Sequence, residues 1–191
     1  MSVRLIVGLG NPGNKYAKTR HNVGAWLVNI LAEKHHLLFH EEKKFQGMIT
    51  SLTWQTHQCW LLLPNTFMNE SGRSVQAISN FYKISAEEIL VAHDELDFPA
   101  GQIRLKINGG HGGHNGLRDI ITQLNSNQFY RLRIGIDHPG HKDQVTPYVL
   151  NEPSLTDKNK IIQAIHEAVE VIPDLLAAQV EKAFRYLHNE K

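Results

Sequence analysis

This chain of 191 residues has little cysteine, little net charge and no long apolar run. Its single cysteine, Cys59, excludes an internal disulfide framework and fits a reducing cytoplasm, so we expect a cytoplasmic protein. No apolar run approaches the roughly 18 residues of a membrane span. Residues 3–9 are too short for a secretory signal and lead directly into glycines. The formal net charge of +1 does not by itself indicate any partner.

The pattern of apolar residues predicts one α/β domain over residues 1–191. The length suits a single domain with a sizeable core, and no repeat, low-complexity tract or linker divides the chain. Strands alternate with helices, which indicates a layered α/β sheet, and two adjacent strands joined by a short turn make that sheet mixed. The expected strands cover residues 3–8, 45–54, 58–63, 89–93, 102–107 and 130–136. The expected helices cover residues 22–36, 70–82 and 115–125.

Two more helices are expected to close the chain. The first begins at Ser154 and Asp157, which have the spacing of a capping box. The second begins near Pro173, because proline suits the first turn of a helix.

The glycine run Gly8–Gly13, GLGNPG, fits the dinucleotide-binding pattern G-x-G-x-x-G. That pattern requires a helix that opens at the second or third glycine and meets the pyrophosphate. Here a polar stretch of about eight residues follows, and helical periodicity starts only at Val23. We therefore predict a loop with no dinucleotide site.

Four polar segments follow or flank short apolar strands: NPGNKYAKTRHN, PNTFMNESG, HDELD and NGGHGGHNG. Loops at the carboxyl ends of strands build the sites of open α/β sheets. His21 and Asp94, from two of these segments, suit a general base and the carboxylate that orients it for activating water. An isolated histidine before a helix also serves as a simple cap, so this structural alternative stays open.

Three asparagines, Asn11, Asn69 and Asn115, lie in three of these four polar segments. An amide offers a donor and an acceptor without charge, so it can bind a peptide group or an oxyanion. Turn formation is the alternative for each residue taken singly. His93, His111 and His114 raise the further alternative of a metal site, although H-x-x-H among glycines lacks the rigid helix of zinc-binding motifs.

The charged residues are unevenly distributed along the chain. Residues 100–142 hold six basic residues against two acidic ones, whereas residues 151–191 hold seven acidic residues against five basic ones. A positive face on a nearly neutral protein suits a polyanionic partner, and an unevenly charged surface without a partner is the alternative.

The sequence resembles the bacterial peptidyl-tRNA hydrolase family over roughly residues 3–150. The resemblance rests on VGLGNPG, YAKTRHNVG, PNTFMNESG, LVAHDELD, GGHGGHNGLRDI, YRLRIGIDHPG and YVL. It departs at Asn151, where the family usually has glycine, which affects a turn and leaves the chemistry intact. The resemblance implies a monomeric, single-domain, three-layer α/β/α fold with a twisted mixed β-sheet flanked by helices. It also implies a hydrolase that needs no metal or organic cofactor and cleaves the ester between a peptidyl group and the 3′ ribose of tRNA.

The resemblance also implies a role for each matching residue. His21 is then the catalytic base and Asp94 its partner, Asn11 and Asn69 bind the peptidyl portion, and Asn115 positions water or stabilises the oxyanion. The implied walls of the substrate groove are Tyr16, Met68 and His114. The implied contacts to tRNA phosphates are Arg104, Lys106 and Arg133. Two alternatives remain beside this esterase: a non-catalytic RNA-binding protein on the same fold, and a metallohydrolase that uses the three other histidines.

Overall fold

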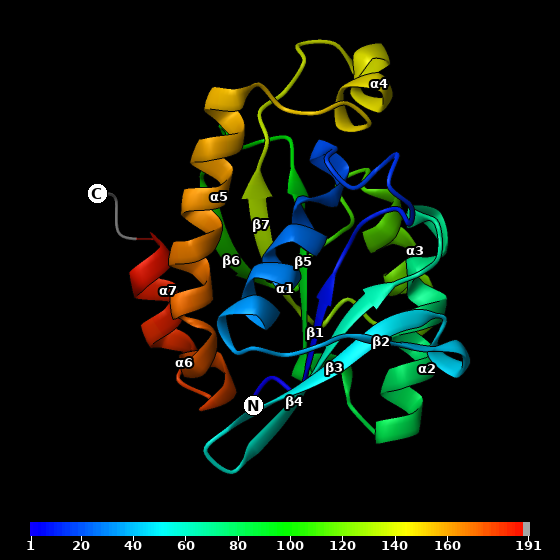
Figure 1. Cartoon of the computed structure of the whole chain (residues 1–191), viewed down its shortest axis with the longest axis vertical. Coiled ribbons are helices and arrows are strands. Elements are labelled where there is room, and N and C mark those ends of the chain that lie inside the picture. The colour runs from blue at the N-terminus through cyan, green and yellow to red at the C-terminus, as the bar shows by residue number, and fades with distance from the viewer. Residues whose placement is uncertain (189–191) are drawn as a thin grey trace.

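The computed structural model describes residues 1–188 and contains a seven-stranded sheet with helices on both faces (Figure 1). The strands are β1 (Leu5–Gly8), β2 (His40–Glu42), β3 (Gly47–Trp54), β4 (His57–Pro64), β5 (Ile89–Glu95), β6 (Ile103–Ile107) and β7 (Tyr130–Gly135). The helices are α1 (Val23–Lys34), α2 (Ser71–Tyr82), α3 (Asn115–Leu124), α4 (Val145–Val149), α5 (Leu155–Glu170), α6 (Ile172–Leu176) and α7 (Val180–His188). Two short 3-10 turns matter for the site, η1 (Arg20–Asn22) and η3 (Met68–Glu70).

The sheet has the strand order β2-β3-β4-β1-β5-β7-β6. Its centre, from β4 through β1 and β5 to β7, is parallel, whereas β2, β3 and β6 pair antiparallel with their neighbours. Strands β1, β5 and β7 therefore all end at the same edge of the sheet, the end of the molecule at which α4 lies (Figure 1). Any site built from the loops after these strands lies at that edge.

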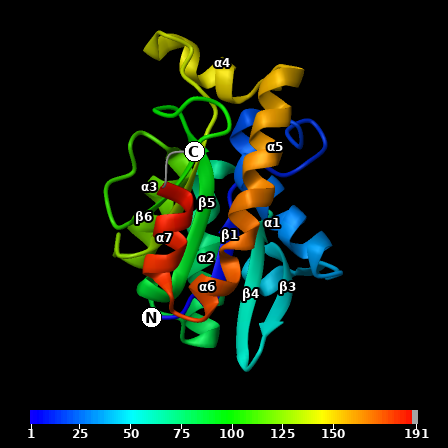
Figure 2. The ribbon, with the colours of Figure 1, turned by 90° about the vertical axis from the view of Figure 1, so that its left-hand side faces the viewer.

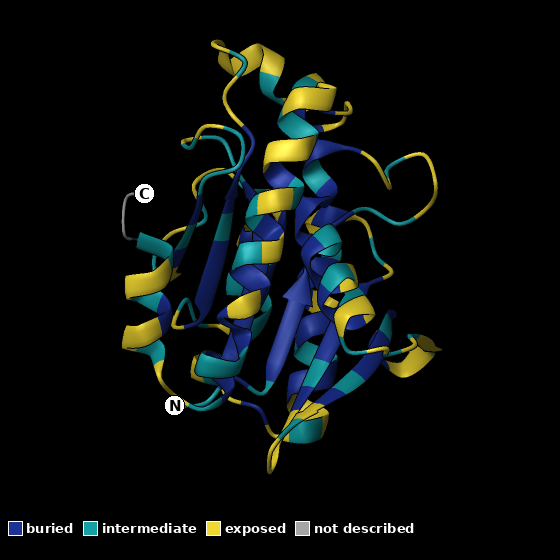
Figure 3. Cartoon of the chain, turned by 60° about the vertical axis from the view of Figure 1, so that its left-hand side comes forward, coloured by how far each residue is buried: buried dark blue, intermediate teal, exposed yellow. Residues whose placement is uncertain are grey.

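Two apolar cores lie on opposite faces of the sheet. Side chains alternate along a strand, so Ile6 packs into one core while its neighbours Leu5 and Val7 pack into the other. The first core includes residues of α1, α5, α6 and α7, and the second includes residues of α2 and α3. Figure 2 shows α6 below α5 and α7 beside β6, and Figure 3 shows buried central strands between the covering helices. The three-layer mixed α/β/α fold is confirmed.

The expected strands and the first three expected helices are present, with boundaries shifted by one or two residues. Strand β2 was not predicted, because HEE has no apolar alternation and lies at the sheet edge. The five-residue helix α4 was also not predicted. Ser154 caps α5 as expected, since its hydroxyl accepts a hydrogen bond from the Asp157 N–H at 3.1 Å. No helix within residues 1–188 is long and apolar enough to cross a membrane.

The second closing helix, α6, begins at Ile172 with Pro173 in its first turn, as predicted. The predicted number of two closing helices is wrong, because α7 follows α6 as a third. The chain breaks between them at Ala178, whose φ of 58° is left-handed. This break lets α7 turn and pack along β6, where the Leu105 N–H donates to the His188 ring. Alanine gives no sequence signal for such a turn, which is usually made by glycine or asparagine.

Candidate active site

The glycine run leads from β1 into a polar loop, and α1 begins only at Val23, as predicted. Gly24, at the start of α1, lies so close to β5 that a Cβ there would be 2.1 Å from the carbonyl oxygen of Ala92. Only glycine permits this approach of helix to strand. It places η1, which carries His21, beside the end of β5, which carries Asp94.

His21, Asp94 and His114 form one hydrogen-bonded cluster. The Nδ1 atom of His21 lies 2.9 Å from Oδ2 of Asp94, and Nε2 of His114 lies 2.8 Å from Oδ1. The side chains are 12%, 3% and 9% exposed for His21, Asp94 and His114. A carboxylate only accepts hydrogen bonds, so both imidazoles donate to it. In neutral His21 the other nitrogen, Nε2, is therefore the one with a free lone pair.

The electrostatics of the cluster favour an ionised Asp94. Burial opposes ionisation of this carboxyl, but His21 and His114 beside it hold its pKa well below the ordinary value. Burial also acts to lower the pKa of His21, yet the charge and hydrogen bond of Asp94 outweigh it and leave that pKa raised. The cluster thus stabilises an imidazolium at His21, which is what a general base becomes after taking a proton.

His93 lies beneath the cluster and stays neutral. It is 3% exposed, its Nδ1–H donates to the backbone carbonyl of Asp94 at 2.7 Å, and its ring meets that of His114 edge-on. Burial, followed by the repulsion from His114, lowers the pKa of His93 to about 3. A neutral ring here supports the backbone of Asp94 without competing for its charge.

The amide nitrogen of Asn11 has no hydrogen-bond partner within residues 1–188. Its Oδ1 accepts a hydrogen bond from the Met68 N–H at 2.8 Å. Buried Asn22 braces the same loop, accepting from the Asn11 N–H and donating to the Asn11 carbonyl, both at 2.9 Å. The Nδ2 donors of Asn11 therefore remain for another acceptor.

The segments that carry the three asparagines converge on Gly116. A Cβ at this glycine would lie 2.6 Å from Sδ of Met68 and 2.9 Å from Cδ1 of Leu9, residues next to Asn69 and two before Asn11. Asn69 and Asn115 are exposed. Oδ1 of Asn115 accepts from Arg118 at 3.1 Å, and within the described part of the chain its Nδ2 has no partner. The expected asparagines thus come from segments in mutual contact.

The three residues expected to line a groove occupy different positions. Tyr16 is partly exposed and meets exposed Phe67 edge-on, with ring centroids 6.4 Å apart. Met68 is only 4% exposed and packs in the core, so mainly its backbone faces Asn11. His114 belongs to the hydrogen-bonded cluster itself and also caps α3, since its Nδ1 accepts from Leu117.

The expected phosphate-contacting residues lie on the antiparallel pair β6–β7. Arg104 is opposite Arg133, and Lys106 is opposite Arg131, so all four cations leave one face of the sheet. Lys106 is exposed, whereas Arg133 is paired with Glu95 at 2.8 Å. Arg104 donates to the carbonyl of Leu187 at the end of α7.

The histidines of the metal alternative are engaged otherwise. His93 is buried, and Nδ1 of His111 accepts a hydrogen bond from Gly113. Among residues 1–188 the group with metal-ligand spacing is instead His21, Asp94 and His114, whose candidate ligand atoms all lie within 4.8 Å of one another. The same ring nitrogens lie within hydrogen-bond distance of the Asp94 carboxylate, so these three residues also fit a hydrogen-bonded cluster.

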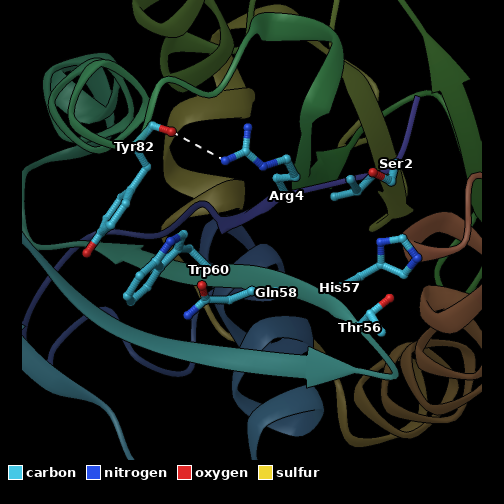
Figure 4. A pocket seen from close by; sticks show the side chains of 8 residues that line it. Ser2, Arg4, Thr56, His57, Gln58, Trp60 and Tyr82 are labelled. Atoms are coloured by element: carbon cyan, nitrogen blue, oxygen red, sulfur yellow. Dashed lines mark hydrogen bonds between the residues drawn. The ribbon is translucent and has the colours of Figure 1, made fainter.

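A separate hollow of about 270 Å³ lies at the opposite end of β1, between Arg4, His57, Trp60 and Tyr82 (Figure 4). The guanidinium of Arg4 donates hydrogen bonds there to the carbonyl oxygens of Tyr82 and Lys83. This hollow is remote from the carboxyl ends of the strands and from the His21 cluster.

Sequence reasoning missed two supporting residues. It did not assign His114 to the Asp94 cluster or Asn22 to bracing Asn11. The position of Asn22 directly after His21 was the available signal, but its contact with Asn11 depends on the fold of the loop between them.

The chain is similar to known proteins over nearly its whole length. The family model for peptidyl-tRNA hydrolase matches residues 5–191. A peptidyl-tRNA hydrolase of Coxiella burnetii is 57% identical over 187 residues, 98% of each chain. One from Legionella pneumophila is 53% identical over 98% of this chain and 100% of its own. The crystal structure of peptidyl-tRNA hydrolase from Acinetobacter baumannii superposes with a TM-score of 0.96 at 46% identity, covering 99% of this chain and 96% of that one.

Proposed function

The chain belongs to the peptidyl-tRNA hydrolase family, and we propose that it cleaves its ester substrate with a water molecule activated by His21. The substrate is peptidyl-tRNA, the products are free tRNA and a peptide, and the role is recycling of tRNA in translation. The observation that carries the mechanism is the hydrogen bond between His21 Nδ1 and Asp94, because it leaves Nε2 as the base.

The chemistry follows from these atoms. Nε2 of neutral His21 takes a proton from water while the water oxygen attacks the ester carbonyl. Asp94 stabilises the imidazolium that forms. The tetrahedral intermediate expels the 3′ oxygen of the ribose, which receives the proton back from His21. One water is consumed, its hydroxyl ending on the peptide and its hydrogen on the ribose.

Amide donors fit the remaining needs of this reaction. The free Nδ2 groups of Asn11, Asn69 and Asn115 bind the peptide and the oxyanion without adding a charge that would repel it. One oxyanion donor is typically worth about 3–4 kcal/mol of transition-state stabilisation. Arg104, Lys106 and Arg133 contact tRNA phosphates, and Tyr16, Met68 and His114 shape the walls around the acyl group. The protein works as a cytoplasmic monomer without a metal or organic cofactor.

The test is cleavage of an N-acyl-aminoacyl-tRNA by substoichiometric protein, with His21→Ala as the variant. We expect the variant to lose about 10²–10⁴-fold in kcat, the usual contribution of a general base, while circular dichroism and tRNA binding stay normal. Near-normal turnover by the variant would refute the role of His21. Binding without turnover by the unaltered protein would favour the RNA-binding alternative, and loss of activity on exhaustive chelation would favour the metal alternative.

A further inference from the structure

Arg131, on β7, is a buried cation without an acidic partner among residues 1–188. It is 2% exposed, and its guanidinium lies over the ring of Phe129, 4.6 Å from the ring centroid. Its two terminal nitrogens donate to the carbonyl oxygens of Gly110 and Gly109, both at 2.5 Å. Burial, with the nearby charge of Arg133, lowers its pKa to about 10, so Arg131 remains charged at neutral pH. A buried charge is costly, which calls for a reason to keep it.

The loop that Arg131 holds has few other restraints. Four glycines lie between Asn108 and His114, and three of them, Gly109, Gly112 and Gly113, have positive φ. A Cβ added at Gly110, Gly112 or Gly113 would meet nothing within 4 Å, so the loop is not packed against the body there. Glycine loses more conformational freedom on ordering than any other residue. The hydrogen bonds from Arg131 therefore restrict the backbone of a loop that has few other contacts.

The far end of the same loop belongs to the active site. His114 ends the loop, donates to Asp94 and caps α3, and Asn115 follows it. Inside the loop, the His111 carbonyl accepts from the His114 N–H at 2.9 Å, and the His111 ring accepts from Gly113 at 3.0 Å. A short turn thus connects the residues held by Arg131 to the residues that hold Asp94.

We propose that Arg131 is a positioning residue, whose guanidinium fork fixes the glycine loop and thereby sets His114 and Asn115 in place for ester cleavage. The inference rests on the proposed function and adds a residue to it. The side chain of Arg131 leaves the same face of the sheet as those of Arg104, Lys106 and Arg133. Arg131 is buried, however, and its terminal nitrogens already donate to two carbonyls, so it is not available to bind a phosphate. Lysine cannot replace it, because an ammonium is a point donor and lacks the planar fork.

The experiment compares Arg131→Lys with Lys106→Met in steady-state cleavage at several salt concentrations. Lys106 is the direct cross-strand neighbour of Arg131 and carries the same charge, but it is exposed. For Arg131→Lys we expect kcat to fall by about 10- to 100-fold, since a displacement of about 1 Å at a reacting group can cost 10²-fold. KM and its salt dependence should stay unchanged. For Lys106→Met we expect the reverse: a higher KM with a shallower salt dependence and an unchanged kcat.

A second readout does not depend on activity. Nuclear magnetic resonance of Arg131→Lys should show lower backbone order in residues 109–113 and faster solvent exchange of the His114 Nε2 proton, while amides of β5 and β7 stay protected. Arg131→Met, should it fold, should behave likewise. An Arg131→Lys protein with normal kcat and an ordered loop would overturn the inference, as would one in which only KM and the salt dependence change. Failure of the unaltered protein to cleave would instead overturn the proposed function, and the loop measurements would still judge Arg131.

Discussion

Replacing Asp94 by asparagine is the most direct test of how the proposed base, His21, is oriented and charged. The substitution keeps the shape of the side chain and removes its charge. One oxygen of Asp94 contacts both imidazoles, and the other contacts His21 alone. An asparagine that keeps its oxygen toward His114 presents its NH2 group to Nδ1 of His21. That NH2 group favours the His21 tautomer with its proton on Nε2, the nitrogen proposed as the base, although the oxygen shared with His114 still lies 3.0 Å from Nδ1.

The expected loss of activity in Asp94→Asn follows from these contacts. A hydrogen bond to a charged group is worth about 1.5–3 kcal/mol, which corresponds to roughly 10- to 150-fold in rate when the imidazolium loses it. The wrong tautomer adds to this loss, up to the whole contribution of a general base, about 10²–10⁴-fold. We therefore expect Asp94→Asn to lower kcat/KM by about 10²–10⁴-fold.

The pH profile of kcat/KM should also shift in a definite direction, which simple misfolding would not produce. If His21 is the base, kcat/KM should rise with pH as His21 loses its proton, and Asp94 keeps the pKa of His21 raised. Without the carboxylate, burial remains and lowers that pKa, so the acid limb of Asp94→Asn should move to lower pH. Asp157→Asn, on α5, removes a charge elsewhere and should leave the profile unchanged. A normal rate with an unmoved acid limb in Asp94→Asn would refute the reasoning.

Three further predictions test the phosphate surface, the buried histidine and the close approach of α1 to the sheet. Lys106→Ala should raise KM with a salt slope reduced by about 1, and an unchanged slope would remove Lys106 from the tRNA contacts. His93 has a folded pKa of about 3, below its unfolded value, so its stability contribution is present above about pH 6.5 and is lost as pH falls toward 3. Urea unfolding should show His93→Leu losing about 2 kcal/mol less than the unaltered protein between pH 7 and pH 5, and parallel losses would contradict this. Gly24→Ala forces a Cβ to 2.1 Å from the Ala92 carbonyl oxygen, which should cost about 3 kcal/mol of stability and is only partly offset by the roughly 1 kcal/mol that alanine gains in a helix. We therefore expect a lower melting temperature, and an unchanged one would show that α1 can move.

Much of this architecture was predictable because it depends on local patterns. The apolar stripe of α1 from Val23 onward and the short β-branched strands require only that one face, or both, be buried. The polar strand β2 and the break at Ala178 were not predictable, because pairing with β3 and packing of α7 on β6 override weak local preferences.

The residue types of the candidate site could also be read from the chain: a histidine before a helix, an aspartate at a strand end and asparagines in glycine-rich loops. Their order and spacing were enough to indicate the family. These residue types can be recognised in the sequence because each lies at a local boundary, where a strand or a helix meets a polar loop.

Which atoms meet is a different matter, settled only by the packed fold. His21 and Asp94 are 73 residues apart and come together because Gly24 lets α1 approach β5. The second imidazole on Asp94 depends on a contact between β5 and the glycine loop, and the bonds of buried Arg131 depend on contacts between β7 and the same loop. A hydrogen bond is sensitive to tenths of an ångström, and no pattern along the chain carries distances between distant segments.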